Sequence, residues 1–167
     1  MAGVSSKEIK SRIRSMESTK QITKAMEMVA ASKLRRAQTQ VLNSRPYFET
    51  LYETINDIVD SNSDFSSPYL TQRGGKRIAY VVIAGDRGLA GGYNSNILKL
   101  CHAEMEGKEV TVLPIGKKSV EFFKSRGISI LSEQYVEAED VSVGDCFSMA
   151  KMLCKAYLRG EFDEIRI

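Results

Sequence analysis

Apolar positions with helical spacing dominate the first third of the chain. A seam of seven apolar residues follows a spacing of three and four, broken only at Ser44: Leu34, Ala37, Val41, Phe48, Leu51, Ile55 and Ile58. A looser stripe precedes the seam and is interrupted by two threonines: Ile9, Ile13, Met16, Ile22, Met26 and Val29. Sustained three-four spacing is typical of a coiled coil, so the seam predicts that a second helix lies along this one.

Residue types around these positions predict one long coiled-coil helix over residues 1–60. Good helix formers dominate it, and Ser5 and Glu8 are expected to form a capping box at its start. Pro46 is its only proline and removes one backbone hydrogen bond, so we expect a bend near Leu42. Two abutting helices are the alternative. A helix of this length would measure roughly 80 Å. The other expected helices of the chain are too short to cover it, so another helix must do so.

Residues 77–167 predict a different architecture, in which short apolar runs alternate with short helices. Strands are expected at residues 77–84, 110–115, 128–131 and 164–167. Helices are expected from Asn94 or Ser95 to Met105, from Lys118 to Ser125 and from Val143 to Leu158. Because this order pairs strands in parallel, the fold class is α/β, with a Rossmann-like, mainly parallel sheet. A linker is expected over residues 61–76, and the domain is expected to be incomplete because the sequence stops within its last strand.

Positive charge is concentrated at the N-terminal end. Residues 1–36 contain nine Lys and Arg against three Glu, a net charge of +6, whereas residues 37–167 contain 15 basic and 18 acidic residues. Such a segment attracts nucleic acid, anionic lipid or an acidic protein surface. Residues 7–36 contain no aromatic side chain that could stack on bases, which argues against nucleic acid.

Motifs for nucleotide, metal or acid–base chemistry are incomplete. The loop Gly85–Asn94 follows a strand and opens a helix, but its glycine spacing departs from the dinucleotide fingerprint. A P-loop needs a hydroxyl where Lys118 stands. The glycines predict a tight turn whose exposed pair, Asp86 and Arg87, either contacts a partner or pairs internally. With His102 as the sole histidine and three cysteines without zinc-site spacing, we expect reduced, partly buried thiols, and no cofactor, metal site or catalytic residue.

Several segments of the chain resemble a known family. Residues 7–13 and 18–37, which include the run ITKAMEMVAASK at Ile22–Lys33, are similar to the N-terminal helix of the F-type ATP synthase gamma subunit, as is Arg45–Tyr47. The loop GDRGLAGGYN is similar to the loop that follows the family's first strand, where many members carry Cys in place of Ala90. The resemblance covers essentially the whole chain. Family members continue through a C-terminal helix, so we expect an N-terminal part that is truncated before that helix.

The resemblance implies a mechanical role and no catalysis by the chain itself. As the central stalk, the chain would wind its first helix antiparallel around a C-terminal helix, inside a ring of alpha and beta subunits. Its α/β domain would lie against the epsilon subunit and the membrane c-ring, peripheral to the cytoplasmic face of a bacterial cell membrane. Its rotation would couple proton flow to ATP synthesis or hydrolysis. The expected partner-interface residues are Ile9, Ile13, Lys20, Ile22, Lys24, Met26, Met28, Val29, Leu34, Arg35, Arg36, Asp86, Arg87 and Leu89.

Three alternatives rest on the residues alone. A coiled-coil adaptor with an α/β module would pair stably with itself through the seam. A nucleic-acid binder would use the basic helix and bind random DNA with a steep dependence on salt. A nucleotide enzyme would hydrolyse its substrate without other subunits, and the incomplete motifs weigh against it.

Overall fold

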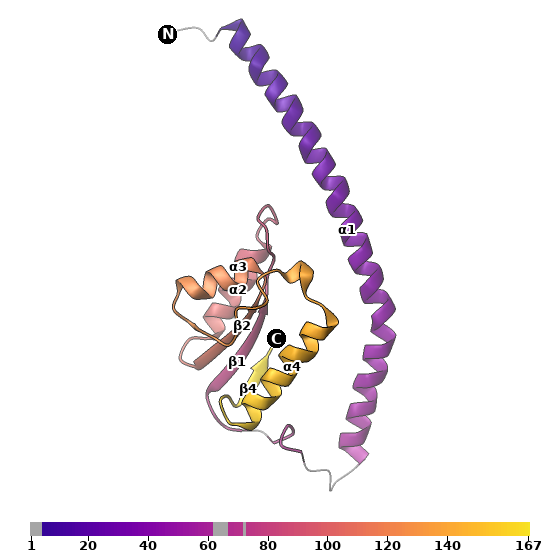
Figure 1. Ribbon diagram of the computed structural model, residues 1–167, viewed down its shortest axis with the longest axis vertical. Coiled ribbons are helices and arrows are strands. Elements are labelled where there is room, and N and C mark those ends of the chain that lie inside the picture. Colours follow the sequence, from indigo (N-terminus) through magenta and orange to yellow (C-terminus); the bar gives the residue numbers. More distant parts are fainter. Residues whose placement is uncertain (1–4, 62–66, 72) are drawn as a thin grey trace. The chain divides into compact units, whose positions relative to one another are not determined.

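The chain divides into two compact units, Met1–Phe65 and Ser66–Ile167. The computed structural model describes residues 5–61, 67–71 and 73–167. The described residues of the first unit form one helix, and those of the second, which we call the sheet unit, form the strands and the shorter helices (Figure 1). The predicted linker over residues 61–76 stays a prediction, because residues 62–66 and 72 lie outside the described part of the chain.

The first unit is built around α1, Ser6–Ser61, a continuous helix of 56 residues. Figure 1 shows it as a single curved rod, so the prediction of one continuous helix is confirmed and that of two abutting helices is wrong, whereas a bend located near Leu42 stays a prediction. Pro46 lies inside the helix and removes one backbone donor without ending it. Among the described residues, α1 and the other helices lack the run of apolar side chains that crossing a bilayer would require.

The start of α1 differs from its prediction. The Glu8 N–H donates to the backbone carbonyl of Ser5 at 2.8 Å, and Ser5 Oγ accepts from the Lys7 N–H at 3.4 Å. The Glu8 carboxylate pairs with Arg12 at 3.0 Å, one turn further along the helix. The predicted capping box between Ser5 and Glu8 is therefore wrong, because a side-chain ion pair at i,i+4 uses the carboxylate that the box needs.

Four parallel strands form the centre of the sheet unit, in the order β3-β2-β1-β4. Their bounds are Arg77–Ile83 for β1, Glu109–Ile115 for β2, Ser129–Ile130 for β3 and Glu164–Arg166 for β4. The middle five residues of β1 are all buried, as is typical of a parallel strand that helices cover on both faces. The prediction of an α/β fold with a parallel, Rossmann-like sheet is confirmed.

Three α-helices and one short 3-10 helix complete the sheet unit. Their bounds are Tyr93–Glu104 for α2, Lys117–Ser125 for α3, Ala138–Asp140 for η1 and Val143–Leu158 for α4. The predicted bounds of α4 are confirmed, whereas η1 was expected as loop. A capping box does occur at the start of α4, where the Ser142 and Asp145 side chains each accept the other residue's backbone N–H. The sequence prediction did not identify this cap.

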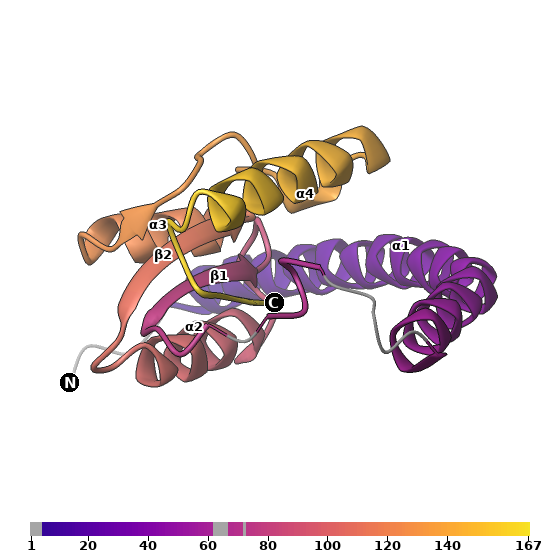
Figure 2. The ribbon, with the colours of Figure 1, turned by 90° about the horizontal axis from the view of Figure 1, so that it is seen from below.

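Side chains that alternate along β1 build a separate core on each face of the sheet. Ala79 and Val81 pack with Leu153 and other residues of α4 on one face. Ile78 and Tyr80 pack on the other face with residues of α2 and α3. Figure 2 shows α2 and α4 on opposite sides of the sheet. The sheet unit therefore has a buried core of its own on each face of the sheet, although other apolar residues, such as Leu100 and Phe147, stay exposed.

Candidate partner-binding surface

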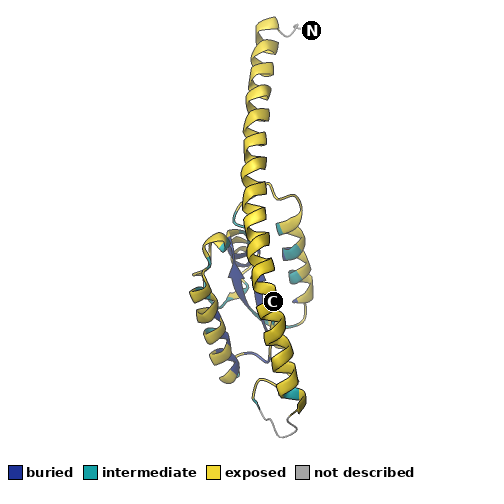
Figure 3. Cartoon of the chain, turned by 90° about the vertical axis from the view of Figure 1, so that its right-hand side faces the viewer, coloured by how far each residue is buried: buried dark blue, intermediate teal, exposed yellow. Residues whose placement is uncertain are grey.

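None of the residues of α1 is buried, although the helix carries a long apolar seam (Figure 3). Leu34, Phe48 and Ile58 remain 59%, 64% and 44% exposed. Complete burial of one such side chain contributes about 1.5–3 kcal/mol. Because a long helix is stable only when its apolar side is covered, α1 has the surface of an element that packs against a partner.

The three-four spacing of the seam continues toward the N-terminus. Counting back from Leu34 by heptads places Ile13 at an equivalent core position, with Ile9 and Met16 at the alternate core positions. Four polar or small residues occupy the core positions between these residues and Leu34: Lys20, Thr23, Glu27 and Ala30. We call this line of core positions, from Ile9 to Ile58, the extended seam. It is apolar at both ends and polar in its middle.

Ile22, Met26 and Val29 form a second stripe on another side of α1. A helix turns about 100° per residue, which places these three residues roughly a third of a turn from the extended seam. All three are exposed. The prediction that they form one stripe with Ile9 and Ile13 is therefore wrong, because the apolar residues after Met16 lie on a different side of the helix. A helix with apolar residues on two sides needs cover on two sides.

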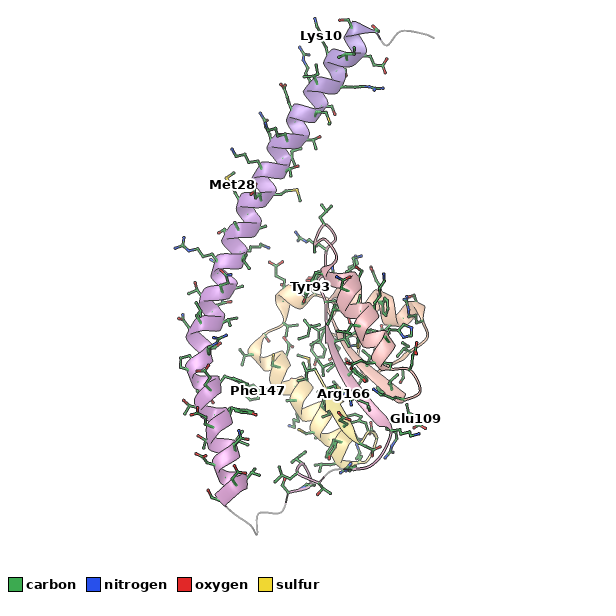
Figure 4. The ribbon with its side chains drawn as sticks, turned by 180° about the vertical axis from the view of Figure 1, so that it is seen from behind. Lys10, Met28, Tyr93, Glu109, Phe147 and Arg166 are labelled. Atoms are coloured by element: carbon green, nitrogen blue, oxygen red, sulfur yellow. The ribbon has the colours of Figure 1, made fainter. Side chains whose placement is uncertain are left out.

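The other predicted contact residues of α1 are distributed around the helix. Lys20 belongs to the extended seam, and Lys24 flanks it. Arg36 follows the second stripe at its heptad spacing, whereas Met28 and Arg35 share a third face. Figure 4 shows side chains, including that of Met28, projecting from α1 in several directions. The structure therefore brings these residues to one segment of helix but not to one face.

The loop between β1 and α2 holds the remaining predicted contacts, of which Asp86 is not freely exposed. Its carboxylate accepts backbone N–H groups from Ala138 at 2.9 Å, Lys117 at 3.1 Å and Glu139 at 3.2 Å. Burial alone would raise the pKa of Asp86, but these three bonds, with the charge of Arg87, outweigh it and hold the pKa below its ordinary value. The prediction of an exposed Asp86 is corrected, because Asp86 is half-buried and ties the loop to α3 and η1.

The Asp86 contacts also bear on phosphate binding. In α/β folds, phosphates bind at the carboxyl ends of strands, on the free N–H groups that begin a helix. Here the carboxylate of Asp86 follows β1 and accepts the Lys117 N–H at the start of α3. Gly116, just before it, approaches the backbone of Ala84 so closely that an added Cβ would lie 2.0 Å from the Ala84 carbonyl oxygen. An internal carboxylate thus occupies a helix N-terminus at which other α/β folds can bind a phosphate.

Leu89 lies at the exposed end of the same loop. Its φ of 61° is in the left-handed region, which costs a non-glycine residue about 1–2 kcal/mol, and its side chain is 95% exposed. Asn94 braces the loop from below: Asn94 Oδ1 accepts the Gly85 N–H at 2.7 Å, and Asn94 Nδ2 donates to the Arg87 carbonyl at 3.2 Å. The start of α2 was expected at Asn94 or Ser95, but α2 begins at Tyr93 without a side-chain cap. Asn94 holds the loop instead, which presents Leu89 and Arg87 outward.

The chain's three thiols and its histidine differ in their surroundings. Burial, with a smaller contribution from Glu104, raises the pKa of Cys101 to about 11, so this thiol is protonated at neutral pH. Cys146 and Cys154 are exposed rather than partly buried as expected. His102 packs edge-on against the ring of Phe122. Within the described ranges, no three side chains of the types that bind metals come together.

Comparison with known proteins assigns the chain to a family. A family model described as ATP synthase matches residues 5–167. The ATP synthase gamma chain of Heliobacterium modesticaldum is 43% identical over 162 residues, which are 96% of this chain and 56% of that protein. The gamma chain of Alkaliphilus metalliredigens is 43% identical over 164 residues, 98% of this chain and 57% of that protein. The chain thus spans about half the length of these curated relatives, and it belongs to the ATP synthase gamma chain family.

Proposed function

We propose that this chain is the N-terminal part of the central-stalk rotor subunit of an F-type ATP synthase. In that role it couples proton flow through the membrane sector to ATP synthesis or hydrolysis. The observation that carries the proposal is α1, a helix of 56 residues with no buried residue and with apolar side chains on two faces. A shaft that pairs with one helix and turns within a ring of other subunits needs such a surface.

The two apolar faces of α1 receive different partners in this proposal. The extended seam takes the C-terminal helix of the full-length protein in an antiparallel coiled coil. The rest of the helix surface, which includes the second stripe, Lys24, Arg35 and Arg36, faces the alpha and beta subunits. Opposite charges steer such a contact without fixing one geometry, which suits a surface that must slide. Met26 and Met28 suit the same requirement, because methionine side chains are flexible and polarisable.

The sheet unit contacts the membrane side of the complex in this proposal. It lies against the epsilon subunit and the c-ring, so the chain is peripheral to the cytoplasmic face of the bacterial membrane. The braced loop that carries Arg87 and Leu89 is a further contact with the ring subunits. The chain itself is non-catalytic and has no cofactor. It contributes contacts that differ from one beta subunit to the next, as conformational coupling requires.

Assembly with the alpha and beta subunits of the same organism tests the proposal. The chain is co-expressed with both subunits, and the products are separated by size exclusion and assayed for ATP hydrolysis. We expect the chain to co-elute with them and to stimulate hydrolysis. The same experiment on a version extended through the C-terminal helix shows whether this part suffices. If neither version co-elutes, the proposal is wrong, and the coiled-coil adaptor becomes the better explanation.

A charge-reversal variant makes the assembly test specific to α1. Exchanging Lys24, Arg35 and Arg36 for Glu reverses the charge on the surface of α1 outside the extended seam, so we expect co-elution to be lost. The matched control exchanges three exposed lysines of the sheet unit for Glu, and its net charge changes equally: Lys99, Lys151 and Lys155. The control should co-elute like the unchanged chain. Equal loss in both variants would mean that net charge, and not the surface of α1, drives assembly.

A further inference from the structure

Two opposite charges occupy core positions of the extended seam. Lys20 and Glu27 lie seven residues apart at equivalent heptad positions, between Met16 and Leu34. Shallow grooves on the surface of α1 follow this line. Their lining includes both charged residues together with Thr23 between them. Any helix that covers the extended seam must therefore cover a lysine and a glutamate about 10.5 Å apart along the axis.

A charge at a core position restricts the partner more strongly than an apolar residue does. Covering Lys20 with apolar side chains removes water from its ammonium group and supplies no hydrogen bond or opposite charge to compensate. An opposite charge on the partner helix offsets that loss, whereas a like charge adds repulsion. Polar residues at core positions are the best-attested means by which coiled coils fix register, at a cost in stability.

A second copy of this chain does not supply both opposite charges at once. In a parallel, in-register pair, Lys20 would face Lys20 and Glu27 would face Glu27. In an antiparallel pair, the two kinds of core position alternate across the interface. Lys20 would then face Met16, Thr23 or an alanine of the second copy, all of them uncharged. The charge pattern therefore favours a helix of different sequence over self-pairing.

We propose that the helix covering the extended seam carries an acidic side chain opposite Lys20 and a basic one opposite Glu27. These two matched charges select the register and the direction of that helix. The inference rests on the proposed function only in requiring that a helix covers the seam. On an antiparallel partner, the basic residue comes first in sequence and the acidic residue follows seven positions later. On a parallel partner the order is reversed.

Two designed peptides test this charge matching. Each is an antiparallel helix of about four heptads, long enough for stable pairing, with leucine at its other core positions. The matched peptide places Glu opposite Lys20 and Lys opposite Glu27, and the reversed peptide exchanges the two. Because both have the same composition and net charge, their Kd values for the whole chain, measured by fluorescence anisotropy, compare the charge arrangement alone. We expect the matched peptide to bind at least tenfold more tightly.

Charge-exchange variants of the chain complete the test. The variant K20E/E27K should reverse the preference, so that the reversed peptide binds more tightly. The control E17K/K24E exchanges the same charges at positions that flank the extended seam and should keep the preference of the unchanged chain. Lys and Glu have similar helix propensities, so α1 should persist in both variants, which circular dichroism checks.

The outcomes separate this inference from the proposed function. Equal binding of both peptides, or a preference that K20E/E27K does not reverse, overturns the charge matching and leaves the rotor role standing. If neither peptide binds, the seam is not a helix-binding surface, and the inference fails together with that part of the proposed function. Co-elution with the alpha and beta subunits is measured independently, so a failure of assembly is recognised as a failure of the proposed function.

Discussion

The two units of this chain use apolar residues in opposite ways. The sheet unit packs its own on both faces of the sheet, and Phe123 is completely buried. In α1 the seam residues are equally apolar, yet they are exposed. Sequence alone marks both sets as candidates for a core. The sheet unit is therefore stabilised by its own core, whereas the apolar surface of α1 is stabilised only when another molecule or segment covers it.

The largest expected effect comes from removing one phenylalanine from each unit. Phe123→Ala leaves a cavity in the sheet unit and should cost about 3–5 kcal/mol of unfolding free energy. The matched change Phe48→Ala, on α1, removes a side chain that is mostly exposed and should cost less than about 0.5 kcal/mol in the isolated chain. Urea unfolding of both variants measures the difference. Similar losses would mean that α1 is covered within the chain after all.

Met26→Lys should act on the assembled complex and not on the isolated chain. In the proposed rotor, the change puts a charge into a contact between the second stripe and the ring, with an expected cost of about 1–3 kcal/mol. ATP yield per proton should fall, while the unfolding midpoint of the isolated chain should stay unchanged. The control Glu49→Lys adds a lysine outside the second stripe. An unchanged ATP yield per proton for Met26→Lys would show that the second stripe does not take part in the coupling contact.

The helix starts of the two units should respond differently to loss of a serine. Ser142→Ala removes the capping box of α4 and should cost about 0.5–2 kcal/mol. Ser5→Ala removes a single long hydrogen bond at the start of α1 and should cost clearly less. Thermal unfolding of the sheet unit and the helicity of α1, both followed by circular dichroism, report the two effects. An equal loss for Ser5→Ala would contradict the structure and indicate that Ser5 forms a capping box after all.

The smallest expected effect concerns pH. The folded state holds the pKa of Asp86 below its ordinary value of 3.8. The charged carboxylate therefore stabilises the fold fully at pH values above that ordinary pKa. This stabilisation is lost as pH falls through the lowered pKa. Asp86→Asn should therefore cost about 1 kcal/mol at pH 7, and nothing once the carboxylate of the unchanged chain is protonated.

Stability curves against pH for both proteins check the Asp86 prediction. The control is Asp57→Asn on α1, where the exposed side chain should contribute little at any pH. A constant difference between Asp86→Asn and the unchanged chain from pH 7 to pH 2 would contradict the role given to the charge. It would indicate that shape, and not ionisation, ties this loop to α3 and η1.

Elements defined by local pattern were predictable from the sequence. The spacing of apolar residues placed α4 at Val143–Leu158, and the β-branched run placed β1 within one residue. The long helix followed from its composition, because good helix formers and a three-four spacing act over neighbouring turns. The seam was predictable for the same reason, since core positions of a helix are set by local geometry.

Features that depend on distant parts of the chain were not predictable. Asp86 is 52 residues from Ala138, so no local pattern indicates that its carboxylate would hold η1. The strand β3 was expected at residues 128–131, but its length was not predictable, because only the two residues Ser129 and Ile130 pair with β2. At the start of α1, both the Ser5 N–H and the Arg12 side chain can bind the Glu8 carboxylate, and the sequence alone does not show which of them does so. The apolar residues of α1 lie on a different side of the helix after Met16. The spacing of the sequence predicts this change, but the prediction of a single stripe misses it because it treats Thr19 and Thr23 as interruptions of that stripe.

Rotation of the sheet unit within an assembled complex tests the rotor account most directly. The full-length protein is assembled with alpha and beta subunits, which are fixed to a surface, and a probe is attached to the exposed Cys146 of α4 after Cys154 is exchanged for Ser. The account predicts that ATP drives the probe in one direction, in repeated steps, and that the motion stops when ATP is removed. A complex that hydrolyses ATP while the probe stays still would contradict the account.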